Sequence, residues 1–349
     1  MEGLSSERLD GLLRRLADVS IAVVGDYFLD KYLLIDPALG EPSLETGLEA
    51  HQVVGKRICP GAAGTVVSNL HALGVGCIRA VGVTGCDGEG FELRQGLGAW
   101  SVDMTGLIED PDIVTPTYTK PMMRQPDGSE REHNRIDIAN REPLSAPLQE
   151  RVAEQIHACV GAVDGIIVAD QVAEPDLGVI GPAMRELVSD IGAQNPDLPL
   201  LVDSRGSIGS YRNVIVKPNA REGAAAVGLD YEDETVARDH ANAIATELHR
   251  RTGRTVYLTL GSAGLAVRDA ERFVRIPGHP VEGPVDIVGA GDSTTAGIVS
   301  ALCAGAEAAE AGLIGALVAS ITIQQLGVTG TATPEQLRMR FEQYMARHA

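Results

Sequence analysis

A short segment with the letters DIVGAGD, residues 286–292, has the composition of an anion-binding turn. Gly289, Ala290 and Gly291 allow the backbone to turn sharply and to bring its N–H groups close to a ligand. The helix predicted to begin at Asp292 directs unpaired N–H groups and the positive end of its dipole to the same place. The segment therefore predicts a site for a phosphoryl or other oxyanion group, with a carboxylate beside it.

Asp292 is placed to act as a base at this predicted site. A carboxylate at the N-terminus of a helix is stabilised in its charged form, so we expect Asp292 to be ionised and able to accept a proton. Phosphoryl transfer to an alcohol asks little of a base, because alignment and charge neutralisation supply most of the catalysis. The pattern suits a small-molecule kinase. The alternative is a helix cap with flanking glycines, which needs no chemistry.

Other phosphate-binding patterns fit the chain poorly. In a G-x-G-x-x-G pattern beginning at Gly289, Thr294 would occupy the third glycine position. No G-x-x-x-x-G-K-[ST] segment exists, and none of the four lysines has that context. The sequence therefore excludes a P-loop enzyme.

The composition restricts the partners of the protein. Its 349 residues carry a formal net charge of -19, and only 3% of them are aromatic. Such a chain repels a phosphate backbone and lacks rings to stack on single-stranded bases, so we expect no nucleic-acid partner. An anionic substrate must then be bound by a compact group of lysines, arginines and backbone amides.

Cysteine usage and hydropathy indicate the compartment. Five scattered cysteines without a C-x-x-C pair favour neither a disulfide framework nor a zinc site. The N-terminal segment mixes acids with arginines and lacks a continuous apolar stretch, which argues against a signal peptide. The most apolar stretch, Ala311–Ile323, is too short to cross a bilayer. We expect a soluble, cytoplasmic protein with no membrane partner.

Short β-branched runs alternate with helical segments along the chain. Continuous apolar strands of this kind are typical of a parallel sheet covered by helices on both faces. The expected strands are Ile21–Asp26, Gly165–Asp170, Leu198–Ser204, Asn213–Asn219 and Thr255–Gly261. The expected helices are Gly64–Leu73, Pro147–Val160, Asp176–Ile191, Glu232–Arg250 and a helix from Asp292 to about Leu302. The series predicts an α/β fold built from βαβ units.

Two segments interrupt this alternation, Tyr32–Pro60 and Asp112–Asn140. The second contains a Pro-Asp-Gly turn between two arms of alternating polarity, which is typical of a β-hairpin. Long excursions from a compact domain are often lids or binding loops. We expect one domain over residues 1–349, with a small β lid formed from about residues 32–60 and 112–140.

Taken together, these features resemble the ribokinase-like carbohydrate kinases, also called the phosphofructokinase B family, over about residues 21–337. The DIVGAGD segment is similar to that family's C-terminal signature. The resemblance implies that Asp292 is the catalytic base and that Gly289, Ala290 and Gly291 form the anion hole. It also implies a three-layer α/β/α ribokinase-like fold with a mostly parallel central sheet, and ATP with Mg²⁺ as the phosphoryl donor.

Three further segments carry the same resemblance. VVGDYFLD (residues 23–30) is similar to the family's sugar-binding start, KPNAREG (217–223) to its N-x-x-E element, and TLGSAG (259–264) to its ATP loop. The substrate-binding residues that this implies are Asp26, Asp30, Gly61, Ala62, Thr65, Lys120, Arg135 and Asp170. The residues implied near the nucleotide are Lys217, Asn219, Glu222, Thr259, Gly261 and Gly264, with Asn219, Glu222 and Asp286 as metal ligands. From the residues alone, Glu222 also fits a solvated acid in a first helical turn, and TLGSAG also fits a hairpin turn.

Within this family, the segments VDSRGSIGSYRNVIVKPNAREG, GVTGCDGEG and QQLGVTGTAT are similar to heptose-phosphate kinases. The resemblance implies transfer to the anomeric hydroxyl of a heptose that already bears a phosphate. Thr65 stands where that branch has asparagine, and Ala173 and Glu174 stand where it has lysine and glycine. Ala62 likewise replaces the second glycine of an early Gly-Gly pair. Another acceptor, such as a nucleoside or a hexose phosphate, therefore stays open, as does a non-catalytic ligand-binding relative.

Three further expectations concern the predicted lid and the acid at the start of the DIVGAGD segment. Lys120, Arg124 and Arg135 lie on the predicted hairpin arms, where arginine can grip a substrate phosphate with two N–H groups; surface charge is the alternative. Asp286 is implied by the resemblance to help a monovalent cation (K⁺) site behind the anion hole, and its alternative is a capping acid. Exposed strand edges in the lid favour a homodimer formed through the lids.

Overall fold

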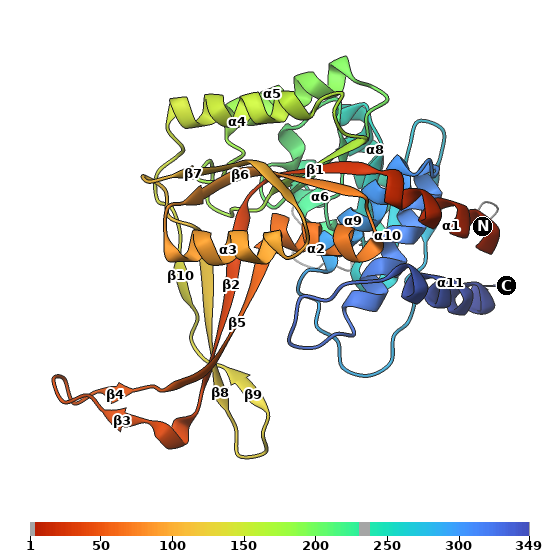
Figure 1. The fold of residues 1–349 in the computed structure, drawn as a ribbon. Coiled ribbons are helices and arrows are strands. Elements are labelled where there is room, and N and C mark those ends of the chain that lie inside the picture. Colours follow the sequence, from red (N-terminus) through yellow and green to blue (C-terminus); the bar gives the residue numbers. More distant parts are fainter. Residues whose placement is uncertain (1–3, 230–237, 349) are drawn as a thin grey trace.

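The computed structural model describes residues 4–229 and 238–348, and its centre is a nine-stranded sheet (Figure 1). The strand order is β16-β15-β14-β13-β12-β11-β1-β6-β7. Neighbouring strands are parallel except at the β14–β15 and β15–β16 pairs, which are antiparallel hairpins. The strands are β1 (Ser20–Gly25), β6 (Cys77–Gly85), β7 (Asp103–Asp110), β11 (Gly165–Asp170), β12 (Leu200–Ser204), β13 (Ile215–Val216), β14 (Val256–Thr259), β15 (Leu265–Arg268) and β16 (Phe273–Ile276).

Helices cover both faces of this sheet, which confirms the expected three-layer α/β/α architecture (Figure 1). One layer contains α1 (Ser6–Arg15), α2 (Ala63–Leu73), α3 (Gly88–Gly98), α9 (Ala290–Cys303), α10 (Ala308–Thr322) and α11 (Pro334–His348). The other contains α4 (Ala146–Cys159), α5 (Pro182–Gln194), α6 (Ala220–Ala226) and α8 (Ala241–Thr252). Within the described ranges, no helix combines the length and apolar character needed to span a membrane.

The two-residue period of the strands sorts side chains between these two layers. Leu201 and Ile215 pack into the core beneath α9, whereas Val202 and Val216 pack into the core on the opposite face. Side chains at the carboxyl ends of the strands continue the alternation. The strand ends can therefore deliver polar groups to either face, and only one of those faces carries the N-terminus of α9.

One expected helix begins later than its sequence predicts. Residues 176–181 form a loop, and α5 starts at Pro182 after Gly181, where proline fits the first helical turn. Asp26 fixes this loop, because its carboxylate accepts the N–H of Val179 at 2.7 Å. The same carboxylate accepts the N–H groups of Gln171 and Val172, before the loop, at 2.7 and 3.1 Å. The expected helix 232–250 lies partly outside the described residues, and its described part is α8.

A second sheet projects from the carboxyl edge of the first and forms the lid (Figure 1). Its order is β10-β8-β2-β5, with β9 paired to β8. The strands are β2 (Tyr27–Ile35), β5 (Val53–Ala62), β8 (Thr117–Arg124), β9 (Glu130–Glu132) and β10 (Ile136–Ile138). A two-stranded arm of β3 (Glu41–Pro42) and β4 (Glu49–Ala50) extends beyond it.

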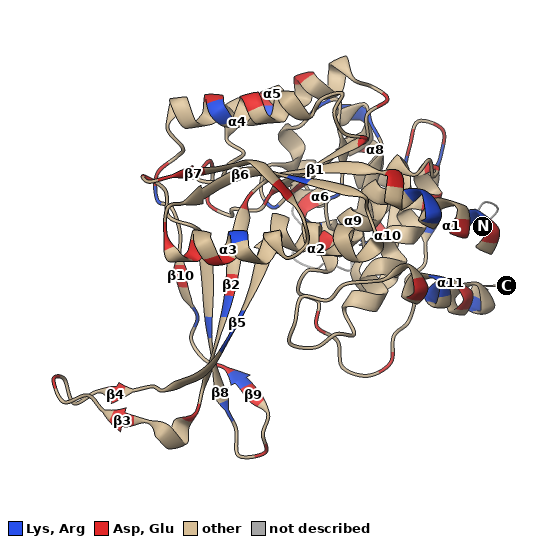
Figure 2. Ribbon diagram, in the orientation of Figure 1, with Lys and Arg blue, Asp and Glu red and all other residues tan. Residues whose placement is uncertain are grey.

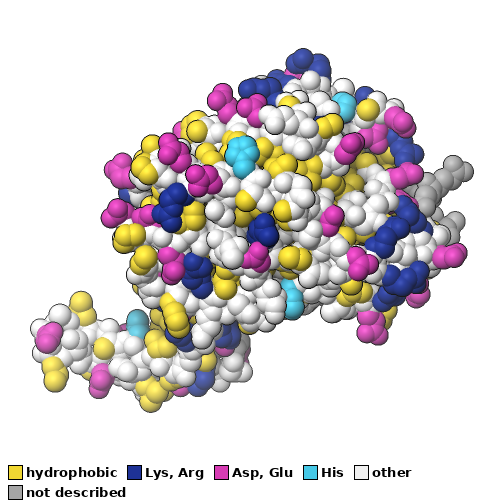
Figure 3. All heavy atoms as spheres, turned by 45° about the horizontal axis from the view of Figure 1, so that its top comes forward, with side chains coloured by type: hydrophobic (Ala, Val, Ile, Leu, Met, Phe, Trp, Pro, Cys, Tyr) yellow, Lys and Arg dark blue, Asp and Glu magenta, His cyan; other side chains and the backbone are white. Residues whose placement is uncertain are grey.

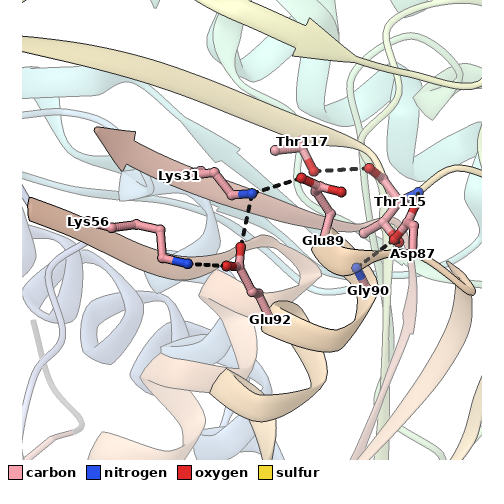
Figure 4. Close-up of polar contacts among 8 residues, drawn as sticks. All are labelled: Lys31, Lys56, Asp87, Glu89, Gly90, Glu92, Thr115 and Thr117. Carbon is pink, nitrogen blue, oxygen red and sulfur yellow. Dashed lines mark hydrogen bonds and ion pairs between the residues drawn. The ribbon is translucent and has the colours of Figure 1, made fainter. Parts of the chain in front are cut away.

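Alternation along the lid strands separates an anchoring face from a site face. On the anchoring face, Lys31 contacts Glu89 at 2.8 Å and Glu92 at 3.0 Å, and Lys56 also pairs with Glu92 (Figure 4). Figure 2 shows the acidic residues of α3 beside basic residues of β2 and β5. This face of the lid is therefore fastened to α3, and the opposite face is left for ligands.

Asp87 joins the lid to the main domain at a second point. Its carboxylate accepts the N–H of Gly90 at 2.7 Å, which caps α3, and the N–H and hydroxyl of Thr115 at 2.8 Å each (Figure 4). Thr117, the first residue of β8, donates to the Thr115 carbonyl at 3.0 Å. One carboxylate therefore fixes a helix start and the entry of a lid strand.

Replacing Asp87 with alanine should destabilise the protein by about 2 kcal/mol, because a helix cap and two further hydrogen bonds are lost together. Urea denaturation followed by circular dichroism measures this change. Asp127→Ala is the control, because Asp127 caps only an exposed turn with Ser129. Equal denaturation midpoints for the two variants would contradict the role given to Asp87.

Candidate active site

A buried ion pair lies below the N-terminus of α9. Lys217 Nζ lies 2.9 Å from Asp203 Oδ2, and the hydroxyl of Thr295 in α9 donates to the same oxygen at 3.1 Å. Lys217 and Asp203 are only 3% and 8% exposed. Gly291 faces this pair, because a Cβ built on it would lie 3.6 Å from Lys217 Nζ. The pair therefore joins β12, the residue after β13, and the anion-binding turn.

Asp292 is the third residue of α9 and is partly buried. Burial and the charge of Asp203 raise its pKa to about 7, and the charges of Lys217 and Arg205 oppose this increase. Burial and the Asp203 charge therefore outweigh the expected preference of the helix N-terminus for ionised Asp292. Two carboxylates share one buried lysine, and the second of them holds its proton more strongly.

The turn before α9 has N–H groups free for an anion. Gly289 adopts φ +77°, which lets the chain reverse into the helix. The Ala290 N–H is already bonded to the Ile287 carbonyl at 3.1 Å. The N–H groups of Gly289, Gly291 and Asp292 have no backbone acceptor among the described residues. Of the three residues expected to form the anion hole, only Ala290 therefore has an N–H group that is already used.

Thr65 lies against this turn from the first turn of α2. A Cβ built on Gly289 would lie 3.2 Å from Thr65 Cγ2 and 3.0 Å from Thr329 Cγ2. Thr65 is buried, and its carbonyl accepts bonds from Ser68 and Asn69 within α2. Its methyl group thus packs on the anion-binding turn, which gives a structural reason for threonine at this position.

The lid presents Asp30 toward the site. Lys120 Nζ lies 2.9 Å from Asp30 Oδ1 and 3.2 Å from the hydroxyl of Tyr32. Gly61 provides room, because a Cβ there would approach Asp30 Oδ2 to 2.5 Å. The Asp30 charge also contributes to raising the pKa of Asp292, so the lid acid lies within electrostatic range of that carboxylate.

Ala62 follows Gly61 with φ +52°, a conformation that favours glycine. The residue is the N-cap of α2 and turns the chain from β5 of the lid into the main domain. The positive φ explains why similar sequences have a second glycine at this position. This chain has an alanine there instead.

The Arg135 side chain contacts an aromatic ring and an acid of the lid. Its guanidinium carbon lies 4.0 Å from the ring centroid of Tyr118. It forms two hydrogen bonds to Asp137, at 2.7 and 2.8 Å. Tyr118 in turn packs edge-on against Phe28, with ring centroids 5.3 Å apart. Arg124 pairs with Asp36 farther along the lid, at 3.0 Å.

Two acids expected to bind substrate have other roles in the structure. Both oxygens of Asp26 accept the backbone bonds that hold residues 171–179, so it positions that loop. Asp170 lies on the sheet face opposite α9, where it accepts bonds from Ser204 at 2.7 Å and Tyr211 at 3.0 Å. Strand alternation explains the difference, because Asp170 shares the face of Val168 and Asp203 that of Leu201.

The implied nucleotide side lies at the carboxyl edge of β13 and β14. Asn219 and Glu222 form a capping box that begins α6, with reciprocal bonds of 2.8 Å between each side chain and the other residue's N–H. A bridge pairs Asn219 with Thr259 at the end of β14. Both implied segments therefore meet at one edge of the sheet, beside the buried Lys217.

Gly261 and Gly264 form the turn of the β14–β15 hairpin, with φ of +58° and +98°. A Cβ on Gly264 would meet the Ile276 carbonyl at 2.1 Å, so only glycine fits there without rearrangement. The segment therefore forms a hairpin turn, which is the alternative that its sequence allowed. The turn follows Thr259, the last residue of β14, which pairs with Asn219.

Asp286 joins two loops behind the anion-binding turn. Its carboxylate accepts N–H bonds from Val288 at 3.1 Å and Gly327 at 3.3 Å, and its own N–H donates to the Ile323 carbonyl. The acid therefore links the DIVGAGD segment to the loop that follows α10.

Sequence reasoning missed three residues of the site, namely Asp203, Arg205 and Gln171. Asp203 and Arg205 belong to the segment LLVDSR at the end of an expected strand, where ligands of parallel sheets bind. That position was the available signal. Gln171 gives no comparable signal, because its role depends on contacts across neighbouring strands.

This arrangement, a three-layer α/β/α domain with a small β-sheet beside the N-terminus of α9, is typical of one class of α/β enzyme. A family model described as "pfkB family carbohydrate kinase" matches residues 33–336. The chain belongs to the pfkB family of carbohydrate kinases, and the expected resemblance is confirmed. It is accordingly a phosphotransferase with an alcohol group as acceptor.

Curated relatives extend over nearly the whole chain. The bifunctional protein HldE of Geotalea uraniireducens is 29% identical over 338 residues, which cover 96% of this chain and 65% of that protein. The bifunctional protein HldE of Geobacter sulfurreducens is 26% identical over 337 residues, with the same two coverages. The chain thus spans 65% of the length of these relatives.

Solved structures show the same fold at low identity. Arabidopsis thaliana ribokinase complexed with ribose and ATP superimposes with a TM-score of 0.65 at 20% identity, covering 93% of this chain and 99% of that one. Escherichia coli phosphofructokinase-2 in complex with potassium gives a TM-score of 0.70 at 17% identity, with coverages of 94% and 99%. The ribokinase-like fold is therefore confirmed.

Replacing Asp292 with asparagine should stabilise the protein above neutral pH. The folded state raises the pKa of Asp292 from 3.8 to about 7, so it binds this proton more tightly than the unfolded chain does. Stability attributable to this group therefore falls as the pH rises from about 4 to 7. We expect Asp292→Asn to be more stable on the order of 2 kcal/mol at pH 8, and equal to the parent near pH 4.

Thermal unfolding of the two proteins across this pH range measures the difference. Asp112→Asn, at an exposed turn, serves as the control and should show no pH-dependent gain. A variant less stable than the parent at pH 8 would show that the Asp292 charge is well compensated in the fold.

Proposed function

We propose that the protein transfers the γ-phosphoryl group of ATP to a hydroxyl of a sugar phosphate, with Asp292 as the general base. The hydroxyl oxygen forms its bond to phosphorus as the bond to the β,γ-bridging oxygen breaks, and the hydroxyl proton passes to Asp292. The products are ADP and an acceptor with one more phosphate. A heptose 7-phosphate, phosphorylated on its anomeric hydroxyl, is the proposed acceptor.

The observation that carries this proposal is the placement of Asp292 beside free helix N–H groups and a buried cation. Its raised pKa suits proton transfer near neutral pH, because a base whose pKa is close to the working pH is both available and effective. The N–H groups of the turn suit the charge on the phosphoryl oxygens. A structural helix cap would need neither a raised pKa nor free donors.

Magnesium fits the acids of the site only in combination with phosphate oxygens. Over residues 4–229 and 238–348, no group of three or more His, Cys, Asp or Glu side chains could hold a metal ion. Mg²⁺ commonly uses one or two carboxylates together with water and substrate phosphates. We propose Glu222 and Asn219 as the residues near the metal, and Mg²⁺ bound with ATP would neutralise charge on its phosphates.

A monovalent cation is proposed beside Asp286. This acid ties the anion-binding turn to the loop after α10, so an ion there would order both backbones. The structure of Escherichia coli phosphofructokinase-2 contains potassium, a finding that concerns that protein.

The lid supports an acceptor that is itself anionic. Lys120 and Arg57 both lie over the ring of Tyr32, at 4.7 and 5.5 Å from its centroid, on the site face of the lid. Arg135 adds a third cation over Tyr118. We propose that the acceptor's existing phosphate binds among these groups and displaces carboxylates that now pair with them. The relatives named HldE and the resemblance to heptose-phosphate kinases favour a heptose over a hexose.

Turnover of Asp292→Asn tests the base. ADP release should fall about 10³-fold or more while ATP still binds, because the amide keeps the shape but cannot accept the proton. Binding of a fluorescent ATP analogue controls for the nucleotide site. Turnover equal to that of the parent would show that Asp292 is not the general base. A parent protein that binds ATP but acts on no acceptor would indicate a non-catalytic relative.

An acceptor panel tests the substrate class. Heptose 7-phosphate should give a kcat/KM at least about 100-fold above unphosphorylated heptose, because the lost phosphate contacts are charge-assisted. Fructose 6-phosphate and a nucleoside complete the panel. A preference for an unphosphorylated acceptor would reject the sugar-phosphate proposal and leave the kinase class intact.

We further propose a homodimer formed through the lids. The lid sheet ends in the edge strands β10 and β5, and its arm exposes Leu39, Leu44 and Leu48 by 54–104%. Figure 3 shows the arm projecting from the body with hydrophobic side chains along it. Such edges and apolar groups are usually covered in a folded protein.

Sedimentation analysis tests this assembly. The parent should sediment at twice the chain mass, and Leu44→Asp combined with Leu48→Asp should shift it toward the monomer. Phe91→Asp, an exposed apolar residue on α3, is the control and should leave the dimer intact. A parent protein that sediments as a monomer at micromolar concentration would contradict the proposal.

A further inference from the structure

Arg205 differs from the other cations of the site in having no carboxylate partner. Lys217 pairs with Asp203, Lys120 with Asp30, and Arg135 with Asp137. No ion pair joins Arg205 to any acid of residues 4–229 and 238–348. Its side chain is exposed at the carboxyl end of β12. A cation in this condition is available to an incoming anion.

A buried glutamine holds Arg205 in place. Arg205 Nε donates to Gln171 Oε1 at 3.2 Å, and Gln171 Nε2 donates to the Asp203 carbonyl at 3.2 Å. The Gln171 N–H donates to Asp26 at 2.7 Å, and the residue is only 6% exposed. Both polar atoms of the Gln171 side chain are therefore hydrogen-bonded, the oxygen to Arg205 and the nitrogen to the Asp203 carbonyl. These bonds hold the Arg205 side chain in one orientation although it is exposed.

Arg205 lies among the elements that would meet the migrating group. It lines a pocket of about 350 Å³ with residues 206–210 and Glu222, and no residue of the turn before α9 lines this pocket. The link to that turn is Asp203, two residues before Arg205, because a Cβ built on Gly291 would lie 4.0 Å from Asp203 Oδ2. Burial raises the pKa of Asp292 and of Tyr118, and the charge of Arg205 opposes both increases. The guanidinium therefore lies within electrostatic range of the proposed base and of the lid.

We propose that Arg205 is a catalytic residue that binds the oxygens of the phosphoryl group during its transfer. The inference rests on the proposed function and adds a cation to its site. As the acceptor oxygen bonds to phosphorus and ADP leaves, charge spreads over the three equatorial oxygens. The two terminal N–H groups of a fixed guanidinium can bind two of those oxygens at once.

Position favours this role over binding of the acceptor's own phosphate. The cations available for a distal phosphate lie on the lid, at Arg57, Lys120 and Arg135. Arg205 instead follows Ser204 on the central sheet and lines the pocket with Glu222.

Steady-state kinetics with ATP, Mg²⁺ and heptose 7-phosphate test the inference. Arg205→Gln should lower kcat about 10²–10³-fold, because a charged donor to the transition state is removed. KM for ATP and for the acceptor should change by less than about threefold, since the loss falls on the transition state. Arg205→Lys should recover part of kcat. Arg250→Gln is the control, because Arg250 is exposed on α8 and pairs with Glu247.

Two further readouts separate catalysis from a merely structural effect. The acidic limb of the kcat/KM profile should move to higher pH in Arg205→Gln, because a charge that favours ionised Asp292 is lost. Guanidinium ion added to Arg205→Ala should restore part of the turnover.

Three outcomes would overturn the inference: parental kcat in Arg205→Gln, an effect confined to the acceptor KM, or an unchanged pH profile together with no rescue. Absence of turnover in the parent protein would instead defeat the proposed function, so the two failures are distinguishable. Circular dichroism of each variant confirms that it is folded.

Discussion

The site depends on burying one lysine at the carboxyl edge of the sheet. An unpaired ammonium group is costly to bury, so Lys217 requires Asp203, which brings the ends of β12 and β13 together. Thr295 of α9 bonds to the same carboxylate, which places the N-terminus of the helix above the pair. A second acid, Asp292, shares this one cation, and burial together with the charge of Asp203 raises the pKa of Asp292 to about 7. The buried Lys217–Asp203 pair thus stabilises the fold and also raises the proton affinity of Asp292 through the charge of Asp203.

The lid follows a different constraint, the alternation of side chains along its strands. Alternate residues of β2 and β5 are fastened to α3 through Lys31 and Lys56 (Figure 4). The residues between them, including Asp30, Tyr32 and Arg57, face the site. Because anchoring and binding use opposite faces of the same strands, the lid can be rigidly attached without occupying the space for a ligand. Both the fold and the proposed acceptor contacts rely on this division.

Local patterns made much of the fold predictable. Apolar strand runs and glycine-rich turns indicated the sheet, and the DIVGAGD segment indicated the turn at α9. The predictions that were wrong or missing concern features that depend on tertiary contacts. The Val179 N–H binds Asp26 in the loop before α5, which starts only at Pro182, and no periodicity in the sequence shows this bond. Asp170 and Asp203 both follow apolar strands, and only the alternation counted across paired strands sends them to opposite faces. The sequence analysis did not identify Arg205 as a site residue, because the orientation of its side chain depends on a hydrogen bond to Gln171.

A crystal structure with ADP, Mg²⁺ and aluminium fluoride would show whether the turn before α9 holds the migrating phosphoryl group beside Asp292. The fluoride mimics the transferring group. We expect it to accept hydrogen bonds from the N–H groups of Gly291 and Asp292, with the Asp292 carboxylate facing it from the acceptor side. A nucleotide whose fluoride lies away from the turn, with Asp292 directed elsewhere, would contradict the account.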